Sequence, residues 1–161
     1  MAVMQAQLST DLLIAGASDV FETMVFMAVE PATDERRIQG PATQGIVSFT
    51  GPIEGCLTVC FSDACAAEVA ANMLGLSRPN LLSPEMLDDA VGEITNMVMG
   101  TVKTATDMFG AVQISTPSIV HGRRLSHELS GRPNRIDAVV MIDDRYPAEL
   151  SLLWRERFES A

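Results

Sequence analysis

Apolar residues recur every three or four positions along two stretches of the chain, roughly residues 9–29 and 84–109. This spacing gathers apolar side chains on one side of an α-helix, so both stretches are predicted to be helices that pack on a core. Ser9 or Thr10, at the start of the first stretch, can cap it. Ser83 and Pro84, a capping residue followed by proline in the first turn, begin the second stretch.

Shorter runs rich in β-branched and aromatic residues predict strands. Residues 46–49 and 56–61 flank a turn with Gly51 and Pro52, which is typical of a β-hairpin. A short helix is expected at residues 63–74, and four further strands follow later in the chain. These four strands are expected at 112–115, 117–122, 136–143 and 148–154, with a polar loop at 123–135.

The order of these elements predicts two halves, each a helix followed by strands, with the small helix between them. Consecutive strands usually pair, so we expect an α+β fold of two layers: a mainly antiparallel sheet with the long helices packed on it. A faint internal echo between the long helices indicates a pseudo-twofold repeat. The echoing positions are Ser18, Glu22 and Val25 in the first helix and Asp89, Glu93 and Asn96 in the second.

Composition narrows the class of protein. The chain has 161 residues and no linker divides it, so residues 1–161 are expected to form a single domain. The formal net charge of −10 argues against a nucleic-acid partner and against an anionic membrane surface, because both attract Lys/Arg-rich proteins. No apolar run approaches the roughly 20 residues that span a bilayer, and the N-terminal residues lack the features of a signal peptide. We therefore expect a cytoplasmic protein.

The cysteines are expected to be free thiols, which agrees with a cytoplasmic location. Cys56, Cys60 and Cys65 do not have the spacing of a CxxC zinc motif, and His121 and His127 fall in a later polar stretch. No metal site is therefore predicted. Cys56 and Cys60 are four residues apart in one predicted strand, so they should face the same side of the sheet.

A polar ridge is predicted along the second long helix, opposite its core side. Glycine costs a helix about 1 kcal/mol relative to alanine, yet Gly92 lies beside this ridge and Gly100 lies on it. Because glycine permits another backbone to approach closely, the ridge suits a protein partner. Within roughly 80° around the helix axis fall Asp89, Glu93, Asn96, Gly100 and Lys103. The core side is expected to comprise Leu87, Val91, Ile94, Val98, Val102, Ala105 and Phe109.

The residues by themselves leave other interpretations open. A glutamate and an asparagine three positions apart are also typical of an ordinary solvated helix face. A small-ligand or metal site built from Asp88, Asp89 and Glu93 is a further alternative. It is disfavoured because Asp88 points away from Glu93 on the helix and no histidine falls in the helix.

The chain resembles the CheX/CheC/FliY family of bacterial chemotaxis phosphatases, and within it the single-site CheX type. The resemblance is carried by Asp89, Glu93 and Asn96 in "DDAVGEITNMVMGTVKT", followed by Pro117 in "ISTPSIVHG". The stretches "DVFETMV" and "GIVSFTGPIEGCLTVCFSDACAAEVAANMLG" also look like CheX. The interval from Asn96 to Pro117 is slightly shorter than the family pattern, which affects the connection after the helix.

The resemblance implies a CheC-like fold and removal of the phosphoryl group from the aspartyl-phosphate of CheY, a response-regulator receiver domain, in chemotaxis or related two-component signalling. It implies that Asn96 orients the attacking water and that Glu93 pairs with a lysine of the receiver, with Asp89 in a supporting role. Gly92 and Gly100 would admit the partner. The chain would need no cofactor of its own, because Mg²⁺ would belong to the receiver, and a homodimer paired through sheet edges is expected.

One alternative remains within the same fold: a module that binds a receiver domain or another signalling protein without accelerating hydrolysis. The presence of both Glu93 and Asn96 argues against it, because a degenerate site would serve for binding alone. The first helix has such a degenerate site, with Val25 where an active site would carry asparagine. Pro117 is interpreted as a strand-start or edge residue and not as a participant in chemistry.

Overall fold

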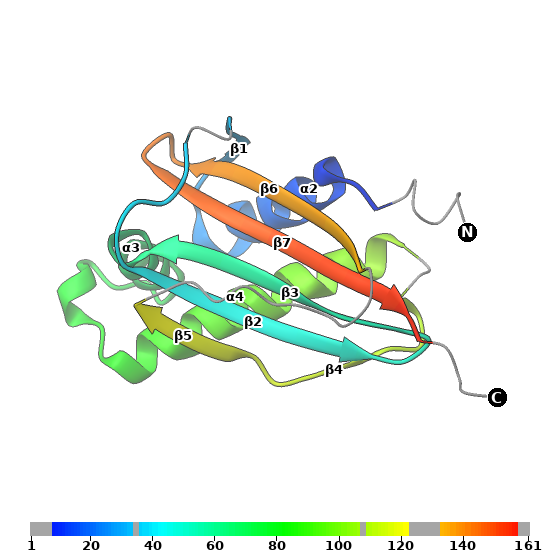
Figure 1. The fold of residues 1–161 in the computed structure, drawn as a ribbon. Helices are drawn as coiled ribbons and strands as arrows, with labels where there is room; N and C mark the ends of the chain where they lie inside the picture. Colours follow the sequence, from blue (N-terminus) through cyan, green and yellow to red (C-terminus); the bar gives the residue numbers. More distant parts are fainter. Residues whose placement is uncertain (1–7, 34–35, 107–108, 123–132, 158–161) are drawn as a thin grey trace.

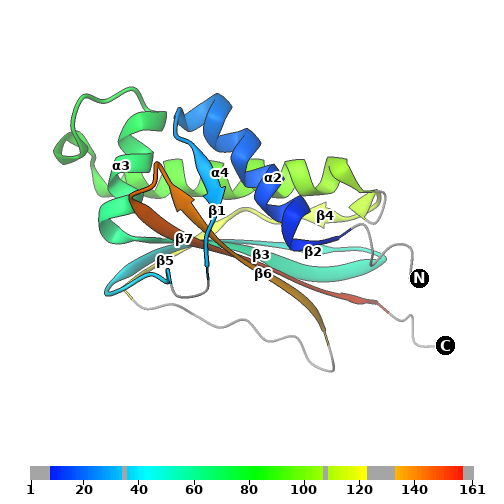
Figure 2. The ribbon, with the colours of Figure 1, turned by 90° about the horizontal axis from the view of Figure 1, so that it is seen from above.

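The computed structural model describes residues 8–33, 36–106, 109–122 and 133–157. In this part of the chain three α-helices cover one face of a seven-stranded sheet (Figures 1 and 2). Every described strand pair is antiparallel, as predicted. Successive side chains of the central strands point to opposite faces of the sheet, and one set of them packs against the helices. Leu57, Val59 and Phe61 are fully buried in the core between sheet and helices.

The sheet is built from two hairpins that meet at its centre. The predicted hairpin is confirmed and is longer than expected, with β2 (Ala42–Thr50) and β3 (Ile53–Ser62) joined at Gly51 and Pro52. The second hairpin consists of β6 (Asn134–Ile142) and β7 (Tyr146–Glu156), and β7 pairs with β3. The remaining strands are β1 (Val29–Pro31) against β6, and β4 (Gln113–Ile114) and β5 (Ser118–Gly122) against β2.

The strand order agrees with the predicted internal repeat. Across the sheet it is β1-β6-β7-β3-β2, with β4 and β5 both paired to the outer side of β2. The order is symmetric about the β7–β3 pair. The short strand β1 of the first half pairs with the hairpin β6–β7 of the second half, and β4 and β5 of the second half pair with the hairpin β2–β3 of the first half. The long helices occupy equivalent places, and the halves are therefore interlocked through the sheet.

The first long helix begins where predicted and ends earlier. Helix α2 (Thr10–Val20) is capped by Ser9, whose side chain accepts a 3.2 Å hydrogen bond from a backbone N–H three residues on. It continues as one π-helical turn, η1 (Phe21–Val25), and stops at Phe26, which has a left-handed φ of 62°. The prediction of helix to residue 29 is wrong at this end. Val29 belongs to β1 instead and pairs with β6, so the last apolar residue of the predicted helix is part of the sheet.

The second long helix also ends earlier than predicted. Helix α4 (Pro84–Ala105) is capped by Ser83, as expected, but its last residue is Ala105 and Thr106 is already extended, with a φ of −145°. Phe109 remains fully buried and meets Phe49 edge-on, with 5.1 Å between ring centroids. Apolar residues thus continue to fill the core after the helix has stopped, which is why the pattern extends beyond its end.

The small helix is confirmed. Helix α3 (Asp63–Met73) is capped by Ser62, which accepts a 3.2 Å hydrogen bond from Cys65, and Gly75 follows it with a left-handed φ of 70°. The predicted loop before α4 contains one 3₁₀ turn, η2 (Pro79–Leu81). No described helix has a stretch long and apolar enough to span a membrane.

The three cysteines are buried free thiols, as expected. Cys56 and Cys60 lie on the side of β3 away from the core cluster under the helices, in two smaller apolar clusters. Cys65 lies in the main core, where burial raises the pKa of its thiol to about 12. Of the predicted polar loop, residues 123–132 with His127 lie outside the described residues, whereas Asn134 and Arg135 begin β6.

Candidate active site

Helix α4 is held against the core by its apolar side. Among the residues predicted for this side, Val91, Ile94, Val98 and Val102 are buried and Leu87 is half-buried. Ala105 is exposed, contrary to the prediction, because it is the last residue of the helix. The buried side is also wider than predicted. It further includes Ala90, Gly92, Thr95 and Met99.

Two close approaches fix the position of α4. The backbone of β2 runs beneath the helix at Gly45, where an added Cβ would overlap Thr95 Oγ1. That hydroxyl is buried and donates a 2.8 Å hydrogen bond to the carbonyl oxygen of Val91. Helix α2 approaches at Gly16, where an added Cβ would lie 2.5 Å from Thr101 Oγ1. The absence of side chains at these glycines lets the sheet and α2 hold α4 firmly, as a rigid base for a site.

The predicted polar ridge faces outward. Asp89 and Glu93 are exposed, and Asn96 is partly exposed one turn further along the helix. Neither Glu93 nor Asn96 makes a side-chain hydrogen bond or ion pair with another described residue. The two carboxylates stand four residues apart, a like-charge spacing that costs a helix a few tenths of a kcal/mol. The side chains of Glu93 and Asn96 can therefore form hydrogen bonds or ion pairs with a partner, and they do not stabilise the fold of their own chain through such contacts.

The two glycines have different roles. Gly92 is buried, and a Cβ there would lie 3.2 Å from the ring of Pro117. The expectation that Gly92 leaves space for a partner is wrong, because Pro117 of the same chain fills that space. Pro117 directly precedes β5, in the strand-start position that was predicted for it. A Cβ added at Gly100 would meet no side chain or neighbouring element within 4 Å, so the space above this glycine is open.

A hydrogen-bonded chain that the sequence did not indicate ties the start of α4 to the sheet. Asp88 Oδ1 lies 2.6 Å from His121 Nε2 of β5, and the other ring nitrogen lies 3.3 Å from Thr43 Oγ1 of β2. Thr43 in turn donates a 3.0 Å hydrogen bond to Asp63 at the start of α3. Asp88 is thus engaged with β5 and turned away from Glu93. No group of three or more metal-ligating side chains occurs among the described residues.

The equivalent position in the first half cannot carry an active site. Ser18 donates a 3.4 Å hydrogen bond to Glu22, which corresponds to the spacing of Asp89 and Glu93. Val25, at the place of Asn96, is completely buried, because the π-helical turn rotates the end of this helix relative to a regular α-helix. This half therefore lacks the amide and also directs that position into the core.

The fold is similar to those of several solved structures. The chemotaxis protein CheX from Vibrio vulnificus matches with a TM-score of 0.74 at 26% identity, over 92% of this chain and 98% of that chain. A CheC-like superfamily protein from Shewanella sp. PV-4 matches with a TM-score of 0.70 at 24% identity, over 90% and 96% of the two chains. These matches confirm the predicted CheC-like fold.

A third match is a chain of the CheX–CheY–BeF3–Mg²⁺ complex from Borrelia burgdorferi, with a TM-score of 0.69 at 18% identity, over 91% of this chain and 97% of that chain. No curated protein matches the chain by sequence. The family profile described as "Chemotaxis phosphatase CheX" matches residues 43–137, more than half of the chain, and this range includes the polar ridge of α4. The chain therefore belongs to the CheX family of chemotaxis phosphatases.

Proposed function

We propose that this chain hydrolyses the aspartyl-phosphate of a CheY-like receiver domain in the cytoplasm, with Asn96 orienting the attacking water and Glu93 anchoring the receiver. The observation that carries the proposal is the outward, unpartnered pair of Glu93 and Asn96 on a rigidly held helix of a CheX-family chain. The solved complex of a structural neighbour with CheY, BeF3 and Mg²⁺ supports the choice of partner.

The chemistry requires positioning more than a strong base. An acyl phosphate is already activated, so its hydrolysis depends on a water held in line with the leaving oxygen. The carboxamide of Asn96 can accept a hydrogen bond from that water and donate another to a phosphoryl oxygen. It does so without a negative charge, which would repel the phosphoryl group. Because α4 is fixed by Gly45 and Gly16, the amide enters the partner's site with little freedom to lose.

Glu93 supplies the anchor in this proposal. Its exposed carboxylate is one turn before Asn96 on the same ridge, so an ion pair with a lysine of the receiver would set the distance between the amide and the phosphoryl group. Asp89 lies one turn further back and supports Glu93 by adding negative charge. Mg²⁺ belongs to the receiver, and the chain is proposed to need no cofactor of its own. A homodimer paired through sheet edges, of which β1 and β5 are examples, also stays a proposal.

The deciding experiment follows the decay of phosphorylated receiver domains from the same organism with and without the purified chain. We expect catalytic amounts of the chain to shorten the lifetime of at least one receiver. If the chain binds a phosphorylated receiver and leaves its decay unchanged, it is a non-catalytic binding module. If it neither binds nor affects any receiver, the proposed function is wrong.

Replacement of Glu93 by alanine is expected to weaken docking more than turnover. Removing one partner of a desolvated ion pair leaves the other charge uncompensated, which corresponds to a loss of affinity of tenfold or more. The dissociation constant is measured for a receiver loaded with beryllofluoride and Mg²⁺, and the hydrolysis rate is measured at saturating receiver. Glu156→Ala, an exposed glutamate at the end of the internal strand β7, is the matched control. Wild-type affinity in Glu93→Ala would remove Glu93 from the interface.

Replacement of Gly100 by alanine is expected to stabilise the chain and to impair docking. The added Cβ meets no atom of another element, so the gain in helix propensity should raise the free energy of unfolding by up to about 1 kcal/mol in urea titration. The same methyl group occupies the open space above the ridge, so affinity for the loaded receiver should fall severalfold. A stabilised variant with unchanged affinity would show that no partner approaches closely at Gly100.

A further inference from the structure

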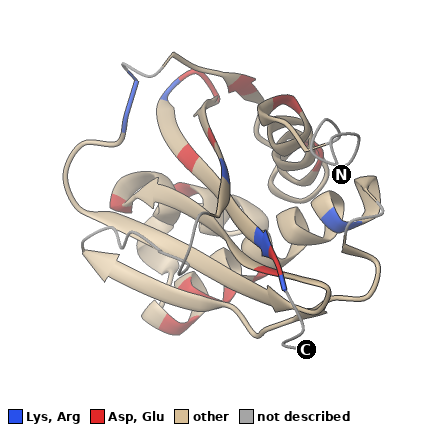
Figure 3. Ribbon diagram, turned by 45° about the vertical axis from the view of Figure 1, so that its right-hand side comes forward, with Lys and Arg blue, Asp and Glu red and all other residues tan. Residues whose placement is uncertain are grey.

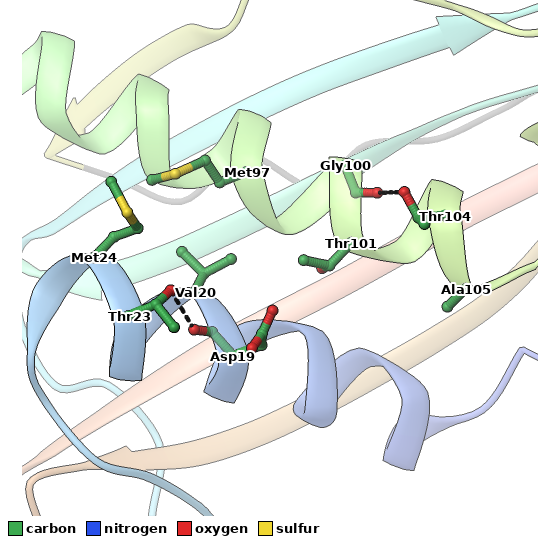
Figure 4. Close-up of a pocket in the computed structure, with 9 residues that line it drawn as sticks. All are labelled: Asp19, Val20, Thr23, Met24, Met97, Gly100, Thr101, Thr104 and Ala105. Carbon is green, nitrogen blue, oxygen red and sulfur yellow. Dashed lines mark hydrogen bonds between the residues drawn. The ribbon is translucent and has the colours of Figure 1, made fainter.

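A groove runs between the two long helices, beside the polar ridge (Figure 4). Its volume is about 570 Å³, and it receives residues from both halves of the chain. It continues the proposed site, because Gly100 belongs both to the ridge and to the groove and Met97 directly follows Asn96. The lining residues are Asp19, Val20, Thr23, Met24, Met97, Gly100, Thr101, Thr104 and Ala105.

The groove is more apolar than its composition indicates. Each of its three threonines donates its hydroxyl hydrogen to a backbone carbonyl of its own helix. Thr23 donates to Asp19 at 2.8 Å, Thr101 to Val98 at 2.7 Å and Thr104 to Gly100 at 2.8 Å. With these donors engaged, the threonines offer methyl groups and no free hydroxyl hydrogen. The lining therefore favours an apolar guest over a polar one.

The lining includes one large apolar side chain that is well exposed. Met24 is 43% exposed, and its side chain lies near that of Met97 across the groove (Figure 4). Phe26 follows two residues later in the chain and is not part of the lining; it is 74% exposed and has a left-handed φ of 62°, a conformation that is strained for a bulky side chain. Methionine adapts to varied apolar partners, and strained backbone is concentrated at functional sites.

Both helices beside the groove carry more acidic than basic residues, and Asp19 brings an exposed carboxylate into the lining itself. The helix α2 with its π-helical turn carries acidic residues and no basic residue, and α4 carries four acidic residues against Lys103 alone. Figure 3 shows these acidic positions along both helices. A partner segment with an apolar side chain flanked by lysine or arginine would complement both the apolar lining and the negative charges of Asp19 and the adjoining Glu93. Of the acidic residues of these helices, Asp19 lies in the groove and Glu93 lies on the adjoining ridge, whereas Asp88 is engaged with His121 of β5.

We propose that this groove is a second contact for the receiver domain, and this inference rests on the proposed function. It takes one apolar side chain from a basic surface segment of the receiver while Asn96 reaches the phosphoryl group. Because five of the nine lining residues are exposed, the groove is open and suits the surface of a protein better than an enclosed small molecule. Two contacts, one polar at the ridge and one apolar in the groove, fix the rotation of the receiver about α4.

Two variants of the groove test this inference by different mechanisms. Met24→Ser removes an exposed apolar contact, and Thr104→Lys places in the groove a positive charge that repels the basic segment proposed for the receiver, at an exposed helical position. Each is expected to raise the dissociation constant of the beryllofluoride-loaded receiver about tenfold, the loss that corresponds to one buried apolar side chain. Hydrolysis at saturating receiver should stay near the wild-type rate, because neither residue lies on the ridge.

Matched controls separate this inference from the proposed function. Leu74→Ser changes an apolar side chain that is 42% exposed and lies outside the groove, and Asn72→Lys adds the same positive charge at an exposed position of α3. Both should keep wild-type affinity, and circular dichroism checks that all four variants are folded. If the wild type hydrolyses the phosphorylated receiver but both groove variants bind it as tightly as the controls do, the groove inference alone is overturned. A wild type without binding or hydrolysis overturns both proposals.

Discussion

Replacing Asn96 by alanine should reduce the acceleration of receiver dephosphorylation about a hundredfold or more, while the chain stays folded. An attacking water that is no longer held in line loses a positioning effect of at least this size. The side chain is partly exposed and makes no hydrogen bond with another described residue, so its removal should change the free energy of unfolding by less than about 0.5 kcal/mol. The hydrolysis rate is measured at saturating phosphorylated receiver.

Two further variants sharpen this prediction. Asn96→Asp keeps the shape of the side chain and adds a negative charge beside the phosphoryl oxygens, so it should also lose most of the activity. Asn72→Ala, at an exposed asparagine of α3, is the matched control and should keep it. An Asn96→Ala variant with near wild-type hydrolysis would exclude a water-orienting role for this amide.

The largest effect on stability is expected for Gly55→Ala, in the middle of the sheet. A Cβ at this position would overlap the carbonyl oxygen of Leu153 and lie 2.8 Å from the Cα of Trp154, both in the neighbouring strand β7. Backbone atoms cannot yield without breaking the pairing of β3 with β7. We expect the free energy of unfolding to fall by about 3 kcal/mol or more, and the Tm to fall by roughly 10 °C.

Thermal and urea unfolding measure this loss, with Gly100→Ala as the contrasting glycine substitution. The two changes add the same methyl group, at a position without space and at an open one. A Gly55→Ala chain as stable as the wild type would mean that β3 and β7 are not paired as described. A chain that fails to fold in the cell would agree with the prediction.

The ridge of α4 could be predicted because it depends on local geometry. Helical periodicity alone places Glu93 and Asn96 one turn apart, on the side opposite Val91, Ile94 and Val98. The start of each helix was likewise predictable, because a capping serine acts on backbone N–H groups only two or three residues away. The resemblance to the CheX family includes Glu93 and Asn96 of this ridge, together with Pro117 and two stretches outside α4.

The helix ends could not be predicted from local pattern. Helix η1 stops at Phe26 because Val29 pairs with β6, more than a hundred residues later in the chain. Helix α4 stops at Ala105, although Phe109 continues the apolar pattern, because that ring fills the core from beyond the helix. In both cases an apolar residue beyond the helix is buried by another part of the fold. The apolar pattern indicates that a residue is buried, but it does not indicate which element the residue belongs to.

The amino-acid sequence alone determined where the helices begin, that the chain has two similar halves, and which face of α4 points outward. Capping residues, apolar spacing and turn glycines specify these features because each acts through residues that are close in sequence. Only the tertiary structure decided that Pro117 covers Gly92, that Val25 packs into the core, and that an open groove runs between the two long helices. These features are contacts between segments that lie far apart in the chain. Their formation depends on how the layers pack, which no short stretch of sequence specifies.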